Sequence, residues 1–153
     1  MPTTFATREG KAYYYNSIPS FIKDDSSSVL GQLVKYSFAI TKAQTDAWSN
    51  QISELKVRLD NAGIDGDIIF EYDIIRLGKR IDVILLIRHM VFSLEFKNGK
   101  GAYAAADARQ AEDYAIDIKN FHKESENLYV CPILIATDAK AIKNQEINYY
   151  QDK

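Results

Sequence analysis

The sequence predicts one α/β domain in which helices flank a mixed sheet, and three observations support this class. The hydrophobic period changes from helical to alternating at Ile68. Three short apolar runs then follow one another, and an alanine-rich helical pattern separates them from one further run. At 153 residues, with 46% hydrophobic and 26% charged residues, the chain can bury one core and is too short for a second full domain.

The first 28 residues mix Thr, Gly, Pro, Ser and charged residues around Tyr13-Tyr14-Tyr15. We expect residues 1–28 to form an arm that packs on the domain without regular structure of its own. Residues 29–153 are expected to form the domain itself. Asp152-Lys153 carries no closing signal, so an interpretation of the chain as a fragment of a longer protein stays open.

Helical spacing of apolar residues begins after this segment. Asp24-Asp25 and the three serines that follow offer N-cap oxygens. The pattern is expected to break near Thr41 and then to resume until Asn61-Ala62-Gly63, which is a stop signal. The expected inward-facing positions are Val29, Leu33, Tyr36, Ile40, Gln44, Trp48, Ile52, Leu55 and Leu59.

A three-strand meander, a helix and a fourth strand complete the predicted order. Alternating apolar residues indicate the strands, and the alanine-rich stretch has the period of an amphipathic helix. The expected elements are strands Ile68–Arg76, Arg80–Ile87 and Val91–Phe96, helix Ala104–Phe121 and strand Leu128–Ala136.

Composition excludes several classes of protein. The net charge of −2 argues against a broadly basic coat for nucleic acid, although a bound Mg²⁺ or Mn²⁺ ion would reverse the local field where acidic residues gather. Cys131 is the only thiol, so no intrachain disulfide can form, and we assign it no chemistry. We find no secretory signal and no apolar run of the length that a membrane helix needs. A cytoplasmic location without membrane partners is therefore expected.

Acidic residues interrupt two of the apolar strands. Asp82 lies in the second expected strand and Glu95 in the third, where a carboxylate is costly unless a cation, a hydrogen bond or water compensates it. Because side chains alternate across a strand, Glu95 and Lys97 share one face, opposite to Phe96. A hairpin around Arg88-His89-Met90 can bring Asp82 close to Glu95 or Lys97 at its open end, in a register that the sequence does not fix.

The element order, together with Asp82, Glu95-Phe96-Lys97 and Gln110-Ala-Glu-Asp-Tyr114, resembles the PD-(D/E)XK nuclease superfamily over about residues 40–136. The Gln-x-x-x-Tyr element is similar to the RecB-like branch. More narrowly, Phe70-Glu71-Tyr72 and Gly78 to Asp82 resemble the nuclease-like region that precedes a Schlafen-type helicase domain in certain bacterial ATP-binding proteins. Ile81 stands where the superfamily pattern has Pro. The 153 residues contain no Gly-x-x-x-x-Gly-Lys-Ser/Thr loop, so ATP chemistry does not belong to this chain.

The resemblance implies a restriction-endonuclease-like αβββαβ core and metal-dependent hydrolysis of phosphodiester bonds. Asp82 and Glu95 would hold Mg²⁺ or Mn²⁺, with the Phe96 carbonyl as a third oxygen. Lys97 would orient the attacking water or stabilise developing negative charge. The alternatives are an ion pair of Asp82 with Arg80 or Lys97, and a solvated strand end at Lys97.

Further residues have weaker assignments. Glu71 is the preferred extra acidic residue, against Glu54 on the preceding helix or an exposed strand edge. Gln110 and Tyr114 lie four positions apart on one helix face and could orient the catalytic lysine or a phosphate, although an aromatic residue at that spacing is also typical of a core. Arg80 is expected to contact phosphate, against an ordinary solvated role.

We therefore expect a metal-dependent nuclease domain, with DNA favoured over RNA as substrate and partner. The alternative is a catalytically inactive nuclease-fold module that binds nucleic acid or docks in a larger ATPase or helicase. Under either hypothesis, a C-terminal helicase or ATPase domain would lie outside this chain.

Overall fold

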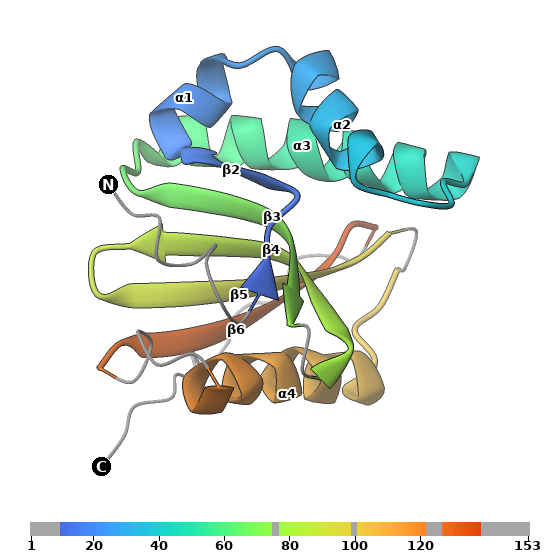
Figure 1. Cartoon of the computed structure of the whole chain (residues 1–153). Helices are drawn as coiled ribbons and strands as arrows, with labels where there is room; N and C mark the ends of the chain where they lie inside the picture. The colour runs from blue at the N-terminus through green and yellow to red at the C-terminus, as the bar shows by residue number, and fades with distance from the viewer. Residues whose placement is uncertain (1–9, 75–76, 99–100, 122–126, 139–153) are drawn as a thin grey trace.

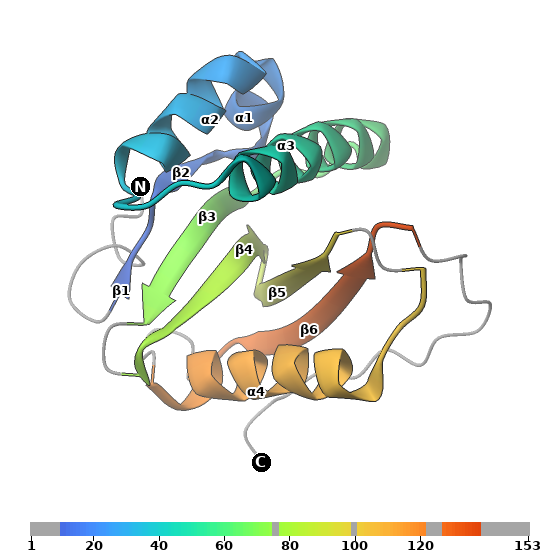
Figure 2. The same cartoon turned by 90° about the vertical axis from the view of Figure 1, so that its right-hand side faces the viewer.

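The structure, a computed structural model, describes residues 10–74, 77–98, 101–121 and 127–138. The elements are β1 (Gly10–Lys11), β2 (Tyr14–Ser17), α1 (Ile18–Lys23), α2 (Ser26–Lys35), α3 (Lys42–Ala62), β3 (Asp67–Ile74), β4 (Lys79–Ile87), β5 (Met90–Lys97), α4 (Ala105–Phe121) and β6 (Tyr129–Ala136). They form three layers, with α1, α2 and α3 on one face of a mixed sheet and α4 on the other (Figures 1 and 2). The predicted α/β class is confirmed, as is the order helix, three strands, helix, strand from α3 onward.

The sheet has the strand order β1-β3-β4-β5-β6, and β2 also pairs with β3. Strands β3, β4 and β5 form the predicted antiparallel meander, and β6 lies parallel to β5. A parallel neighbour requires a crossover connection. Helix α4 provides it, and this connection brings α4 against β5 and β6 on the second face of the sheet.

Residues 10–25 are not the irregular arm that the sequence predicts for residues 1–28, and residues 1–9 lie outside the described residues. Strands β1 and β2 pair with β3 at the sheet edge, and α1 follows directly. The Ser17 hydroxyl accepts a hydrogen bond from the Ser20 N–H at the start of α1, while Ile18 and Phe21 are fully buried. These elements span two to six residues, which is too short for a hydrophobic period to develop.

The helical region agrees with the sequence except at the end of α2 and at Gln44, which lies in the first turn of α3 and is exposed rather than inward-facing. Thr41 caps α3 through the Gln44 N–H, and Gly63 ends it in the left-handed conformation with φ of 59°. Helix α2 ends at Lys35, so Tyr36 and Ile40 lie beyond it and are 39% and 40% exposed, rather than facing the core. Both residues therefore belong to a surface.

Two hydrophobic cores lie on the two faces of the sheet. The core under α1, α2 and α3 includes Phe21, Leu33, Trp48, Ile52, Leu55, Phe70, Val83, Leu94 and Phe96. The core under α4 includes Ile69, Tyr72, Ile74, Ile81, Ile84, Val91, Ala115, Ile118 and Val130. Cys131 is a buried free thiol.

The alternation of side chains in β3 changes at Glu71. Phe70 belongs to the core under α3, whereas Tyr72 belongs to the core under α4. Glu71 has φ of 54°, which is uncommon for a residue with a side chain. The pairs Phe70↔Val83 and Tyr72↔Ile81 place Asp82 directly across from it. The local break in regular strand geometry is therefore at the two acidic positions.

Strands β4 and β5 separate beside Asp82. Their pairing ends at Val83↔Leu94, although β4 begins at Lys79 and β5 continues to Lys97. The first part of β4 stays with β3, and the last part of β5 stays with β6. Figure 2 shows the two strands running apart. We call this place, which lies between Lys79–Asp82 of β4 and Glu95–Lys97 of β5, the strand fork.

Candidate active site

The strand fork brings Asp82, Glu95 and Lys97 together, as predicted for the open end of the β4–β5 hairpin. Asp82 replaces the missing strand pairing, because its Oδ2 accepts a hydrogen bond of 2.8 Å from the Phe96 N–H. Lys97 Nζ lies 3.6 Å from Glu95 Oε1, so these two side chains share a face. Leu94 and Phe96 pack in the opposite core. The predicted alternation in β5 is confirmed.

Lys97 is held by side chains from α4. Its Nζ donates to Gln110 Oε1 at 2.8 Å and lies 3.8 Å from Asp107 Oδ1. Gln110 Nε2 in turn donates to the Tyr114 hydroxyl at 3.0 Å. The Lys97 side chain is only 21% exposed, which is inconsistent with the solvated-strand-end alternative. Gln110 therefore contacts Lys97 directly, whereas Tyr114 contacts Gln110 and restrains the lysine only through it.

Glu71 lies at the same fork and is held from the other side. Its Oε1 accepts a buried hydrogen bond of 2.8 Å from Trp48 Nε1 on α3, and its Oε2 lies 3.2 Å from Arg80 Nε. The competing residue Glu54 points away, pairing with Arg58 on the exposed side of α3. The structure thus places Glu71, and not Glu54, near Asp82 and Glu95, and we call these three carboxylates the acidic cluster.

The three carboxylates influence one another's protonation. Burial, and then the charge of Asp82, raise the pKa of Glu95 to about 8, although Lys97 opposes the shift. Burial raises the pKa of Glu71 to about 7, against the hydrogen bond from Trp48. Burial also raises the pKa of Asp82, against the Phe96 N–H and Lys97. Like charges in a poorly solvated place favour the protonated forms unless a cation is present.

The donor set suits a hard cation held by two carboxylates. Glu95 Oε2 is buried and has no hydrogen-bond partner among the described residues, so one oxygen is available for a ligand. In the described part of the chain, no three His, Cys, Asp or Glu side chains are gathered closely enough to hold a metal ion. Mg²⁺ commonly takes only one or two protein carboxylates and completes its shell with water and substrate phosphate. Asp82 and Glu95 are the two carboxylates that could serve as such ligands, while both Glu71 oxygens have partners.

Arg80 lies beside the cluster with its side chain 45% exposed. Besides Glu71, its guanidinium binds the Tyr13 hydroxyl through Nη1 at 2.7 Å and lies 5.2 Å from the centre of the Tyr13 ring. Within the described part of the chain, neither Arg80 nor Lys97 forms an ion pair with Asp82, although the charges of both oppose the rise in its pKa. A contact between Arg80 and phosphate stays a prediction.

Three residues at the site were not predicted from the sequence. Trp48 is buried in the core as expected, but its indole N–H also binds Glu71. Asp107 near Lys97 and Tyr13 near Arg80 are the others. Asp107 lies three positions before Gln110, one turn along the same helix face, and that spacing was the available signal. Nothing in the spacing of Tyr13 or Trp48 indicates their partners.

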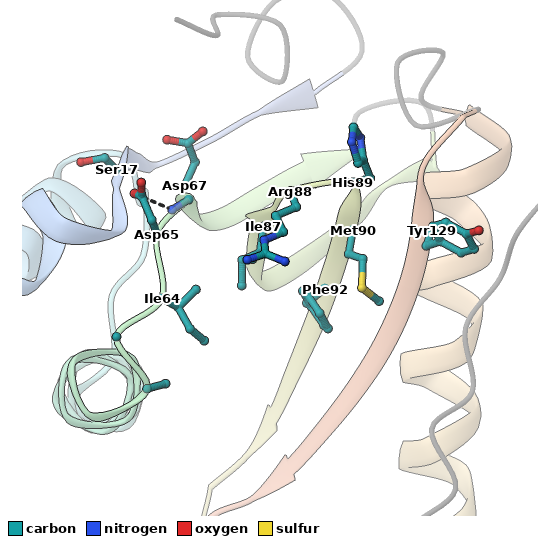
Figure 3. Close-up of a pocket in the computed structure, with 13 residues that line it drawn as sticks. Ser17, Ile64, Asp65, Asp67, Ile87, Arg88, His89, Met90, Phe92 and Tyr129 are labelled. Atoms are coloured by element: carbon teal, nitrogen blue, oxygen red, sulfur yellow. Dashed lines mark hydrogen bonds between the residues drawn. The ribbon is translucent and has the colours of Figure 1, made fainter.

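A separate open groove of about 1120 Å³ lies at the other end of the β4–β5 hairpin. Figure 3 shows Ile64, Ile87, Met90 and Phe92 lining it, below Arg88 and His89. Ile87 is five positions along β4 from Asp82, which corresponds to about 16 Å of strand. The groove is therefore distinct from the strand fork.

Comparisons with models of protein families, with curated proteins and with solved structures found no match to this chain. Among the helices of the described residues, none combines the length and the apolar character needed to cross a membrane.

Proposed function

We propose that this chain is a metal-dependent nuclease domain that hydrolyses phosphodiester bonds, with DNA as the favoured substrate, on a restriction-endonuclease-like αβββαβ core. One observation carries the proposal. At the strand fork, two carboxylates, Asp82 and Glu95, lie beside a restrained lysine, and one buried Glu95 oxygen lacks a hydrogen-bond partner among the described residues. The element order of α3 to β6 and the Gln110–Tyr114 pair on α4 agree with it.

Asp82 and Glu95 would hold Mg²⁺ or Mn²⁺, with the Phe96 carbonyl as a third oxygen. The bound ion would lower the pKa of a coordinated water and neutralise charge on the phosphate. Asp82 is preorganised for its part, because the Phe96 N–H fixes one of its oxygens. Glu71 contributes negative charge near the ligands, since its charge also raises the pKa of Glu95.

Lys97 is the positioned cation of the proposed reaction. Its contacts with Glu95, Asp107 and Gln110 hold the ammonium at the fork, where it can donate to a phosphate oxygen or to the attacking water. Tyr114 restrains Gln110 and so acts on Lys97 only indirectly. Arg80, which is partly exposed beside Glu71, is the proposed phosphate contact at the entrance.

A catalytically inactive module that binds nucleic acid within a larger ATPase or helicase is the second candidate. The contacts of both Glu71 oxygens with Trp48 and Arg80 favour it, because they give this carboxylate a role within the fold that needs no metal. Calorimetric titration with Mn²⁺ distinguishes the two candidates. An active site should bind Mn²⁺ and lose that binding in Asp82→Asn, whereas the inactive module should show no Asp82-dependent binding.

The direct test of the proposed function is cleavage of labelled single-stranded, double-stranded and branched DNA and of RNA with Mg²⁺ or Mn²⁺. We expect cleavage by the wild type and a loss of about 10²- to 10³-fold in Lys97→Ala, the size typical of removing one stabilising donor. Lys42→Ala is the matched control, because Lys42 is also paired with a carboxylate, Asp46, but on the exposed surface at the start of α3. It should cleave like the wild type.

Thermal unfolding of both variants verifies that they fold. A wild type that is silent on all four substrates with both metals would contradict the proposed activity. Equal losses in Lys97→Ala and Lys42→Ala would contradict the assigned role of Lys97.

A further inference from the structure

A row of aromatic and basic side chains leads away from the acidic cluster across the sheet edge. We call it the tyrosine strip and define it as Tyr13, Tyr36, Lys11, Lys35 and Arg80. The Tyr13 and Tyr36 ring centres are 5.8 Å apart. Lys11 Nζ lies 4.9 Å and Lys35 Nζ 5.9 Å from the centre of the Tyr36 ring. Three elements that are distant in sequence, β1, α2 and β4, thus contribute to one surface.

Arg80 connects the strip to the strand fork. Its guanidinium contacts Glu71 Oε2 at one end and both the ring and the hydroxyl of Tyr13 at the other. The edge strand is interrupted at this point, since β1 ends at Lys11 and β2 begins at Tyr14. Continuing the pairs Lys11↔Asp73 and Tyr14↔Phe70 places Tyr13 across from Glu71. Tyr13 therefore lies across from Glu71, where the backbone of β3 is irregular, and so beside the acidic cluster.

The exposure of the strip permits a ligand to reach it. Tyr36 is 39% exposed and both lysines are exposed, so either ammonium can leave the ring for a phosphate. Further along the chain from Tyr36, Phe38 and Ile40 are also exposed. Tyr36 and Ile40 do not continue the buried face of α2, because this helix ends at Lys35.

Aromatic rings interleaved with cations match the chemistry of a single nucleic-acid strand. Unpaired bases offer π-faces that stack on tyrosine, and the backbone phosphates pair with lysine and arginine. A duplex keeps those base faces inside its own stack and offers only its phosphates and groove edges to the same surface. The strip should therefore discriminate between single and double strands.

We propose that the tyrosine strip binds an unpaired nucleic-acid strand and leads it through Arg80 to the strand fork, with a base stacked on Tyr36 and phosphates on Lys11 and Lys35. This inference rests on the proposed function, because it identifies the strand held by the strip as the substrate of that site. It narrows the substrate class to nucleic acid with a single-stranded segment.

Binding is measured without cleavage, by fluorescence anisotropy in EDTA with the full chain. The probes are a fluorescein-labelled DNA strand of about 16 nucleotides, near the upper site size of one small binding domain, and the corresponding duplex. We expect the single strand to bind more tightly than the duplex. Tyr36→Ala should weaken single-strand binding about tenfold, as expected for one lost stacking contact. Tyr36→Phe should retain the wild-type affinity.

The control is Tyr15→Ala, because Tyr15 is a tyrosine of the same 39% exposure and lies beside Asp67 rather than beside lysines. It should bind like the wild type. The double variant Lys11→Ala, Lys35→Ala should reduce the slope of log affinity against log salt by about 1.4, since each phosphate contact on a single strand contributes about 0.7. Lys23→Ala, on α1, should leave the slope unchanged.

The outcomes separate this inference from the proposed function. Equal affinity for single strand and duplex, no binding of the single strand, or equal effects of Tyr36→Ala and Tyr15→Ala would overturn the inference, whether or not the protein cleaves. Tyr36-dependent binding by a wild type that cleaves nothing in Mg²⁺ or Mn²⁺ would uphold the strip and contradict the nuclease.

Discussion

The Glu95 carboxylate is buried, with one oxygen 3.6 Å from Lys97 and the other without a hydrogen-bond partner among the described residues. Such an arrangement is unfavourable for an anion, because burial removes water that no other group replaces. The free energy of the site is therefore lowest when Glu95 is protonated or when a cation lies against it. If Glu95 only stabilised the fold, an apolar side chain would do so without the free-energy cost of burying a charge.

The pKa of Glu95 yields a prediction about the stability of the metal-free protein. The folded-state pKa of about 8 lies above the ordinary value of 4.5, so the folded state retains a proton that the unfolded state has released between these pH values. The free energy of unfolding should therefore fall as pH rises across this range, by about 1.4 kcal/mol per pH unit for each such proton. Glu71, with a pKa of about 7, adds to the loss over the lower part of it.

Urea unfolding in EDTA at about pH 5 and about pH 8 measures this dependence. Glu95→Gln resembles the protonated side chain and should show a shallower decline than the wild type. Added Mg²⁺ should recover stability at the higher pH in the wild type only, because a ligand of the folded state stabilises it. A wild type that becomes more stable from pH 5 to pH 8 in EDTA would contradict the electrostatic account.

Among individual site residues, the sequence predicted those whose charged side chains interrupt an apolar strand pattern. Asp82 and Glu95 are conspicuous within strands of Ile, Val and Leu, and Lys97 follows from the alternation of β5. Trp48 could not be assigned its partner, because a buried indole looks like core whether or not its N–H binds a carboxylate. Tyr13 was hidden in a segment that carries no period.

Two irregularities of the sheet create the site at the scale of elements. The positive φ of Glu71 interrupts β3, and the separation of β4 from β5 exposes the Phe96 N–H to Asp82. A regular hairpin would occupy that N–H with a backbone carbonyl instead. Residues held in sparsely populated backbone conformations are found disproportionately at functional sites, which agrees with the proposal.

Among the described glycines, Gly66 is the one whose replacement should reduce the stability of the fold most. It joins α3 to β3 with φ of 149°, its carbonyl accepts the Ile18 N–H at 2.8 Å, and an added Cβ would collide with the Leu86 carbonyl oxygen. Gly66→Ala should reduce the free energy of unfolding by more than about 1 kcal/mol, because the backbone must shift. Urea unfolding measures the change.

Gly31→Ala is the matched control for this substitution. Gly31 lies within α2, and a Cβ there would meet nothing within 4 Å. Alanine is favoured over glycine in a helix by up to about 1 kcal/mol, so this variant should be more stable than the wild type. If both variants lost equal stability, the tight approach of Gly66 to β4 would be wrong.

Element prediction from the sequence succeeded where the pattern was long. The 21-residue α3, with Thr41 before it and Gly63 after it, carries both a period and its end signals. Strands β1 and β2 were missed because their pairing with β3 depends on partners 50 to 64 positions away in the chain. Local sequence does not contain that information.

For the whole molecule, the three layers deliver different groups to one place. Helix α3 supplies Trp48 to Glu71, the sheet supplies Asp82 and Glu95, and α4 supplies Gln110 to Lys97. The candidate site therefore needs the complete fold, since no single element contains more than part of it. The sequence could predict the layers and their order, but the register that joins them required the structure.

The most direct test of the central claim is a crystal of the protein soaked in Mn²⁺, examined for anomalous density. The account predicts one or more peaks at the strand fork, within coordination distance of Asp82 and Glu95 and near the Lys97 ammonium. Carboxylates that stay at the fork with no density between them at saturating Mn²⁺, or density confined to other parts of the surface, would contradict it.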